Sequence, residues 1–389
     1  MDSLSRPSVA PALSLQQQEL TLLAEPAVPP PLRDALLGES PRDALLKALE
    51  GISPEERNER QQQMLLLLKG QGSASAALDR QGDEPLLQQL HCEAGASDPT
   101  LCIDAAAAGQ AAFRLALSTV LPLVTALLGG LLLLGQAWRL LRGRLMAWPD
   151  VQGPELTLVD MALLVAGGFV VISAVGVPLV AFPLVGALTA GLGSPRREAV
   201  SVVINYGVMA LPSLLILWRQ LRSLPGERAP LGGWMQWRVR PLLSALRDAL
   251  AGWLMVTPVV MLTGWLLVRL VGDPGGSNPL LELVLGSRDP LALALLALTA
   301  VVLAPLFEET IFRGALLLPV LAMRLGPFPG VLLSGLLFAM AHISVGELAP
   351  LTVLGVGLGL VRLRSGRLWP SVLMHGLWNA VTFLNLLLL

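Results

Sequence analysis

The sequence predicts an all-α protein that crosses a membrane several times. Of its 389 residues, 54% are hydrophobic and 14% are charged, whereas soluble domains usually carry about 25% charged residues. Apolar runs recur from about residue 115 onward, and several approach the roughly 20 residues that a helix needs to cross a bilayer. The formal net charge of −1 argues against a nucleic-acid partner, because phosphate binding needs a basic surface. We therefore expect the lipid bilayer to surround most of the chain.

Composition changes near residue 105. The preceding residues contain both lysines, Lys47 and Lys69, and most of the acidic residues, whereas every cationic side chain after that point is Arg or His. We predict three parts on this basis: an N-terminal helical extramembrane region at residues 1–104, N-terminal transmembrane helices at 105–289, and a C-terminal transmembrane core at 290–389.

Two helix starts are predicted within the extramembrane region, and no catalytic grouping is visible there. Ser40 followed by Pro41, and Ser53 followed by Pro54, each combine a capping side chain with a proline suited to the first helical turn. The leucine run that follows the second start is too short to span a bilayer.

The remainder of the chain contains about eight hydrophobic segments, each expected to form a transmembrane helix. Several are shorter than a full span, so their number is approximate. They lie at roughly 115–138, 156–182, 199–217, 249–271, 290–318, 330–345, 348–361 and 368–389.

Arginines set the expected orientation. They cluster after odd-numbered crossings, in what we call the arginine-rich loops: Arg139, Arg142, Arg144; Arg219, Arg222, Arg228, Arg238, Arg240, Arg247; Arg324; and Arg362, Arg364, Arg367. Because positive loops stay in the cytoplasm, residues 1–104 are expected to be extracytoplasmic. Arg196 and Arg197 are exceptions, offset in part by Glu198. The expected location is a bacterial-type plasma or internal membrane.

The only two cysteines, Cys92 and Cys102, are close enough in sequence to form a disulfide that closes a short loop. This pairing suits an oxidising compartment and therefore the extracytoplasmic side. Two free thiols are the alternative. A zinc site is less favoured, because too few further ligands lie nearby.

The fifth hydrophobic segment contains three ionisable residues, Glu308, Glu309 and Arg313. Charges inside a bilayer cost at least a few kcal/mol and usually serve a function. On a helix, Glu309 and Arg313 lie one turn apart on one face, which also suits a structural ion pair. Glu308 points about 100° away from Glu309 and has no cation nearby in the sequence. It is therefore the stronger candidate for chemistry.

Two later segments also carry polar side chains. His342 follows Phe338 by one helical turn, and Asn379 follows His375 at the same spacing. Since lipid-facing positions are costly, these groups are expected to converge with Glu308 on an interior, water-filled cavity. Hydrogen bonds between helices are the competing explanation for a lone intramembrane histidine.

A carboxylate beside imidazoles can deprotonate water and stabilise an oxyanion. Glu308, His342 and His375 are also a donor set for a divalent metal such as zinc. The His-Glu-x-x-His motif of common zinc proteases is absent from the sequence. A glycine stripe, Gly355, Gly357 and Gly359, predicts close helix approach near the cavity.

Three motifs in this order, Glu308-Glu309-x-x-x-Arg313, Phe338-x-x-x-His342 and His375-x-x-x-Asn379, resemble the CPBP family. This family comprises the CAAX proteases and bacteriocin-processing proteins, also called the Abi or type II CAAX prenyl endopeptidase family. The resemblance covers about residues 290–389 and none of residues 1–104. It implies an intramembrane endopeptidase, commonly classed as a metalloprotease, whose cavity opens toward the cytoplasmic half of the membrane.

The resemblance also implies roles for the motif residues. Glu308 would be the general base that activates water, and His342 would position that water or bind a metal. His375 and Asn379 would stabilise the oxyanion. The supporting residues would be Glu309, Arg313 and Phe338. Because an amide is a poor zinc ligand, we favour glutamate-activated water. A divalent metal such as zinc is the alternative, and no other cofactor is expected.

The expected substrate is a membrane-associated peptide or protein. Two other functions use the same residues. Buried Glu, Arg and His can form a proton relay in a transporter, although paired broken helices in both halves of the chain are not visible. A non-catalytic membrane scaffold or immunity protein would keep the motifs only for folding.

Overall fold

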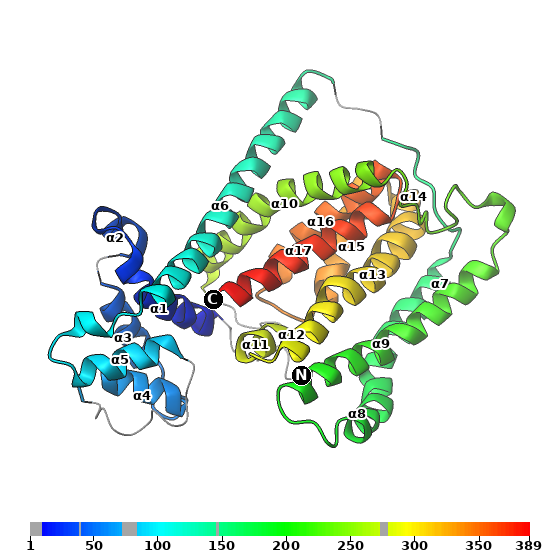
Figure 1. Ribbon diagram of the computed structural model, residues 1–389. Coiled ribbons are helices and arrows are strands. Elements are labelled where there is room, and N and C mark those ends of the chain that lie inside the picture. The colour runs from blue at the N-terminus through cyan, green and yellow to red at the C-terminus, as the bar shows by residue number, and fades with distance from the viewer. Residues whose placement is uncertain (1–9, 39, 72–83, 145–147, 273–278) are drawn as a thin grey trace. The chain divides into compact units, whose positions relative to one another are not determined.

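The computed structural model describes residues 10–38, 40–71, 84–144, 148–272 and 279–389, and every regular element in these ranges is a helix (Figure 1). The predicted all-α class is confirmed. The chain forms two compact units. We call Val9–Leu123 with Leu388–Leu389 the N-terminal unit, and the one that contains Val124–Leu387 the membrane unit.

The N-terminal unit is built from short amphipathic helices. Their buried faces form one leucine-rich core around Leu45, Leu49 and Leu90. The helices are α1 (Ala10–Ala24), α2 (Pro30–Leu37), α3 (Pro41–Gly51), α4 (Glu59–Leu68) and α5 (Pro85–Gly95), with short 3₁₀ turns η1 (Glu25–Ala27) and η2 (Pro99–Cys102).

Two helices in this unit begin directly after a residue whose side chain caps the helix N-terminus. Helix α3 begins where predicted, with the Ser40 side chain accepting a hydrogen bond from the Asp43 N–H. The predicted start at Ser53 is wrong. Helix α4 begins at Glu59 instead, because Asn58 and Gln61 form a reciprocal capping box that satisfies two backbone donors.

Polar contacts and a disulfide tie these helices together. The Arg60 guanidinium pairs with Glu19 at 2.7 Å and with Glu84 at 2.5 Å, and these carboxylates raise the pKa of Arg60 above its ordinary value. The structure joins Cys92 at the end of α5 to Cys102 in η2 by a disulfide.

Seven helices in the described residues are long and apolar enough to cross a membrane. The sixth predicted segment, 330–345, corresponds to a shorter apolar helix, α15 (Pro327–Ala341). The long ones are α6 (Ala105–Leu141); Leu158–Leu188, comprising α7 (Leu158–Ala162), η3 (Leu163–Ala181) and α8; α9 (Arg196–Arg222); α10 (Leu242–Val271); Pro290–Leu325, comprising α12, η5, α13, η6 and α14; α16 (Leu348–Ser365); and α17 (Trp369–Leu388).

The membrane unit has two distinct ends. Figure 1 shows α8 (Phe182–Leu188), α11 (Pro279–Gly286) and α12 (Pro290–Ala297) at one end, and α14 (Met323–Leu325) at the other. The end with α14 carries the arginine-rich loops, and we call it the arginine end. The exceptional Arg196 lies at the opposite end, where it pairs with Asp289 at 2.8 Å. A hydrogen bond from the Ala292 N–H lowers the pKa of Asp289, so this pair offsets the unexpected positive charge.

A loop that includes the short turn η4 (Gly226–Arg228) closes the arginine end. Met235 is buried in the main apolar cluster together with Leu368. The Gln236 side chain accepts a hydrogen bond of 2.6 Å from fully buried Arg362, and Trp237 packs edge-on against Trp369. We call residues 229–241 the plug loop, because they fill the space between helix ends at this side of the bundle.

Glycines allow α15 and α16 to pack very closely, as the stripe predicts. A Cβ atom added at Gly355 would lie 2.7 Å from the Gly335 Cα atom and 3.1 Å from the Arg313 Nη2 atom. Added Cβ atoms at Gly357 and Gly359 would meet side chains of Val256 and Val331. The close contact at Gly355 therefore lies directly beside the buried arginine.

We predict that Gly355→Ala destabilises the membrane unit by about 1–3 kcal/mol, the usual cost of overpacking a tight contact. The backbone atoms of Gly335 cannot move aside as a flexible side chain could. Thermal unfolding of the purified protein in detergent measures the effect. Gly264→Ala is the matched control, because a Cβ atom there would meet nothing within 4 Å. Equal melting temperatures for the two variants would contradict the prediction.

Candidate active site

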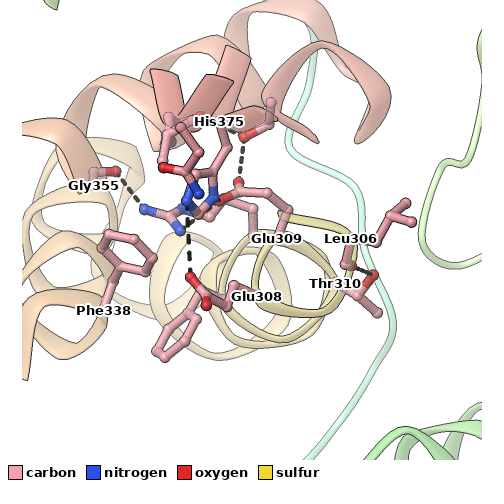
Figure 2. Close-up of polar contacts among 12 residues, drawn as sticks. Leu306, Glu308, Glu309, Thr310, Phe338, Gly355 and His375 are labelled. Atoms are coloured by element: carbon pink, nitrogen blue, oxygen red, sulfur yellow. Dashed lines mark hydrogen bonds and ion pairs between the residues drawn. The ribbon is translucent and has the colours of Figure 1, made fainter. Parts of the chain in front are cut away.

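The two glutamates lie in the middle of a long helical span. They end α13 (Ala304–Glu309), which is flanked by two π-helical stretches, η5 (Leu298–Leu303) and η6 (Thr310–Ala322). Such widened helical turns often occur at functional sites, because they redirect side chains. Figure 2 shows Glu308 and Glu309 leaving neighbouring positions of this span in different directions.

Glu309 is the centre of a fully buried polar network. Its carboxylate accepts hydrogen bonds from Arg313 at 2.8 Å, from Ser371 at 2.5 Å and from the His375 Nδ1 atom at 2.9 Å. Both Glu309 and Arg313 have no exposed surface. Since an unpaired buried charge is very costly, a carboxylate at this position requires these partners.

Arg313 extends the network to α16 and α15. Its Nη2 atom donates to the Gly355 carbonyl at 3.0 Å, and its guanidinium carbon lies 4.3 Å from the ring centre of Phe338. Phe338 also contacts the rings of His342 and His375, with centroid distances of 4.8 and 5.6 Å. Of the predicted supporting residues, Glu309 contacts His375, Phe338 contacts both histidine rings, and Arg313 contacts Glu309 and Phe338.

Glu308 faces the two histidines across short gaps. Its Oε2 atom lies 4.0 Å from the His342 Nε2 atom and 3.9 Å from the His375 Nε2 atom. Within the described part of the chain, this oxygen is buried without a hydrogen-bond partner. The gaps are too wide for direct hydrogen bonds, which join atoms about 2.7–3.2 Å apart. A water molecule about 2.8 Å from each atom would span them.

Hydrogen bonds fix the orientation of both imidazole rings. His342 ends α15, and its Nδ1 atom lies 2.9 Å from the Phe338 carbonyl oxygen. The His375 Nδ1 atom faces the Glu309 carboxylate. Because a carbonyl and a carboxylate only accept, each Nδ1 carries the proton. Both Nε2 atoms are therefore directed to the side on which Glu308 lies.

Asn379 lies one helical turn beyond His375 in α17. Its Nδ2 atom donates to the Ala300 carbonyl in η5 at 2.7 Å, which leaves one further N–H for another acceptor. The structure thus brings Glu308, His342 and His375 into one cluster, with Asn379 on the wall of the same cavity.

That cavity has a volume of about 620 Å³. The polar groups at its inner part are Glu308, His342 and His375, and its remaining wall is largely apolar. The wall includes Ser173, Val177, Val202, Asn205, Tyr206, Met209, Leu280, Leu281, Thr299, Ala300, Ala304, Phe338, Glu347, Leu351, Leu354, Trp378, Asn379, Thr382, Phe383 and Leu386. A space of this size can hold part of a peptide beside the ionisable groups.

Sequence reasoning missed three of the polar residues around the glutamates. Tyr206, the only tyrosine in the chain, donates to Glu308 at 3.3 Å. Ser371 anchors Glu309, and Asn205 lines the cavity with a buried Oδ1 atom that lacks a partner among the described residues. The sequence offered one signal for these residues: Asn205 and Tyr206 are adjacent polar residues within an apolar segment.

The predicted metal ligands fit a zinc ion in chemistry but not in spacing. Two Nε2 lone pairs and a carboxylate are suitable donors, and Glu309 orients His375 as outer-shell carboxylates do. However, ligand atoms around a tetrahedral zinc ion are about 3.3 Å apart given bonds of about 2.0 Å, whereas these lie 3.9 and 4.0 Å from the Glu308 oxygen. Among the described residues, no three His, Cys, Asp or Glu side chains form a metal-binding group.

Two parts of the chain match known family models. Residues 290–381 match the family model described as type II CAAX prenyl endopeptidase Rce1-like. This segment is therefore a domain of a CAAX-type intramembrane protease family, which confirms the resemblance seen in the three motifs. All four candidate catalytic residues lie within the matched range. Residues 10–79 match a separate model, a domain of unknown function (DUF8675).

One curated relative is similar to part of the chain. It is an "Uncharacterized 24.3 kDa protein" of Escherichia coli, 33% identical over 141 residues, which are 35% of this chain and 64% of the relative. The chain thus spans somewhat less than two thirds of that protein's length. No solved structure matches significantly.

We predict that Arg313→Met destabilises the membrane unit by about 3–5 kcal/mol, because Glu309 is left charged and buried. Adding Glu309→Gln should restore part of this loss. Thermal unfolding in detergent measures both variants. Arg364→Met, at an exposed position of α16, is the control and should have little effect. The prediction fails if Arg313→Met is as stable as this control.

Proposed function

We propose that this protein is an intramembrane endopeptidase in which Glu308 activates a water molecule to hydrolyse a peptide bond. The observation that carries the proposal is the unpartnered, buried Glu308 oxygen facing two imidazole Nε2 atoms at 3.9 and 4.0 Å. The Rce1-like match of residues 290–381 supports the same class of reaction.

In the proposed reaction, a water molecule sits between Glu308, His342 and His375. Glu308 accepts a proton from this water as its oxygen attacks the scissile carbonyl carbon. Glu308 then transfers that proton to the departing amide nitrogen when the C–N bond breaks. Tyr206 donates to the other Glu308 oxygen and so keeps Oε2 directed at the water.

The two histidines have different roles in the proposed reaction, because the attacking water has only two hydrogen atoms to donate. Water has two hydrogens, so it cannot donate to the Glu308 oxygen and to both Nε2 atoms at once. His342, held by a neutral carbonyl, accepts from the water and positions it. His375, held by a carboxylate, carries the additional proton and donates from Nε2 to the developing oxyanion. The free N–H of Asn379 assists farther along the wall.

Two other functions would use the same residues, namely a proton-relaying transporter and a non-catalytic membrane scaffold or immunity protein. The same set of variants separates them from the protease. A transporter would move its substrate in vesicles without cleaving peptides. A scaffold would keep its biological effect after loss of the Glu308 carboxylate.

We predict that Glu308→Gln lowers the cleavage rate of a membrane-anchored peptide by about 10²–10⁴-fold, because the amide cannot accept a proton from water. Purified protein in detergent or lipid vesicles is assayed with a peptide library, and melting temperature reports folding. Glu227→Gln is the matched control, since Glu227 is exposed in η4 and does not line the cavity. Cleavage by folded Glu308→Gln protein at the wild-type rate would reject the mechanism.

A chelator decides whether a metal takes part. We expect EDTA to leave the cleavage rate unchanged, because the proposed steps use only the side chains of the chain and one water. Loss of activity that added zinc restores would instead support a zinc ion held by Glu308, His342 and His375, with zinc content measured by elemental analysis.

A further inference from the structure

The candidate catalytic cavity extends toward only one end of the membrane unit. Along Pro290–Leu325, the lining residues run from Glu308 near the middle back to Thr299. In α17 they run from His375 forward to Leu386, close to the end of the helix at Leu388. Both directions lead away from the arginine end.

Helix α11 and the turn between α15 and α16 form the outer part of the cavity wall, at the end opposite the arginine end. Leu280 and Leu281 belong to α11, which lies with α12 at the end opposite α14 (Figure 1). Glu347 belongs to the turn between α15 and α16. The cavity therefore reaches the connections that are opposite the arginine-rich loops.

The arginine end is closed instead. There the plug loop inserts Met235 against Gly314, where an added Cβ atom would be 2.1 Å from the methionine Cε atom. The Leu368 N–H donates to the Gln236 carbonyl at 3.2 Å. Of the described residues that line the cavity, none belongs to the plug loop. A peptide entering from this side would have to displace a buried methionine and a buried arginine, Arg362.

Charge relates these two ends to the two sides of the membrane. Arginine-rich loops remain in the cytoplasm. The other end carries fewer arginines, namely Arg196, Arg197, Arg269 and Arg288, and Arg196 is paired with Asp289. The same order of crossings places the Cys92–Cys102 disulfide on the extracytoplasmic side, where disulfides persist. Two independent features of the chain thus give one orientation.

We propose that the cavity opens to the extracytoplasmic side and accepts an apolar peptide segment at the extracytoplasmic end of a membrane anchor. This differs from the cytoplasmic opening that the family resemblance implies. The apolar wall, with Leu281, Leu351 and Phe383 near the mouth, suits hydrophobic side chains next to the cleaved bond. The substrate assignment rests on the proposed protease function, whereas the orientation does not.

Thiol labelling tests the orientation without using catalysis. Glu347→Cys places a thiol at the cavity mouth, and Ser223→Cys places one on an exposed position after α9 at the arginine end. We expect a membrane-impermeant maleimide to label Glu347→Cys in intact bacteria and Ser223→Cys only after permeabilisation. The wild-type chain, with both cysteines in a disulfide, is the unlabelled control. The reverse pattern would overturn the proposal.

Reporter proteins fused after Leu389 provide a second test of the orientation, one that does not depend on thiol reactivity. Helix α17 ends at Leu388, at the same end as the cavity mouth. Alkaline phosphatase fused there should be active, and a green fluorescent protein that folds only in the cytoplasm should be dark. A fluorescent fusion without phosphatase activity would overturn the extracytoplasmic opening.

Two reporter substrates then test the substrate class. Each has the same apolar anchor and flanking peptide, placed on the extracytoplasmic side in one and on the cytoplasmic side in the other. We expect cleavage of the first only, abolished by Glu308→Gln. Cleavage of only the cytoplasmic version would overturn this inference while the proposed protease function stands. Cleavage of neither, with the orientation established, would reject the substrate assignment together with the protease function.

Discussion

The buried ion pair between Glu309 and Arg313 is the interaction on which the site depends. Two opposite charges without exposed surface are tolerated only when both are satisfied. Arg313 reaches the Gly355 carbonyl on α16, while Glu309 accepts from Ser371 and His375 on α17. Three helical segments are thereby held in one arrangement, and the imidazole of His375 is held in one orientation.

Adjacent glutamates have different environments because a helix turns by about 100° per residue. Glu309 points into the contact with α17, where every partner is supplied by protein. Glu308 points into the cavity, where its Oε2 atom faces imidazoles at 3.9 and 4.0 Å but bonds to none of the described residues. One carboxylate therefore holds the structure together, and the other is free to act on water in the proposed reaction.

The membrane unit is also asymmetric from end to end. At one end the plug loop fills the bundle with Met235 and pairs Gln236 with buried Arg362. Toward the other end, polar atoms of Asn205 and Ser173 line the cavity without partners among the described residues. Buried polar atoms of this kind are normally satisfied by water, and a hydrated entrance at that end agrees with the proposed direction of substrate entry.

The sequence by itself determined the all-α class, most of the spans and the motif residues, because charges within long apolar runs are conspicuous. It also predicted the Glu309–Arg313 pair and the glycine contact of α16, since spacing along one helix determines which side chains share a face. Only the tertiary structure revealed that Tyr206 donates a hydrogen bond to Glu308. Tyr206 is 102 residues away from Glu308, and helical periodicity carries no information over that distance.

Tertiary structure likewise decided where the cavity leads. The plug loop closes one end through contacts such as Arg362 to Gln236, which are 126 residues apart. Spacing along the chain could place His342 and His375 on helices facing an interior, but not at a given depth. Depth depends on how far each helix slides along its neighbours, and packing at glycines such as Gly335 and Gly355 sets that position. The sequence therefore identifies the candidate catalytic residues, whereas the fold alone sets the distances between them and the end of the bundle toward which their cavity extends.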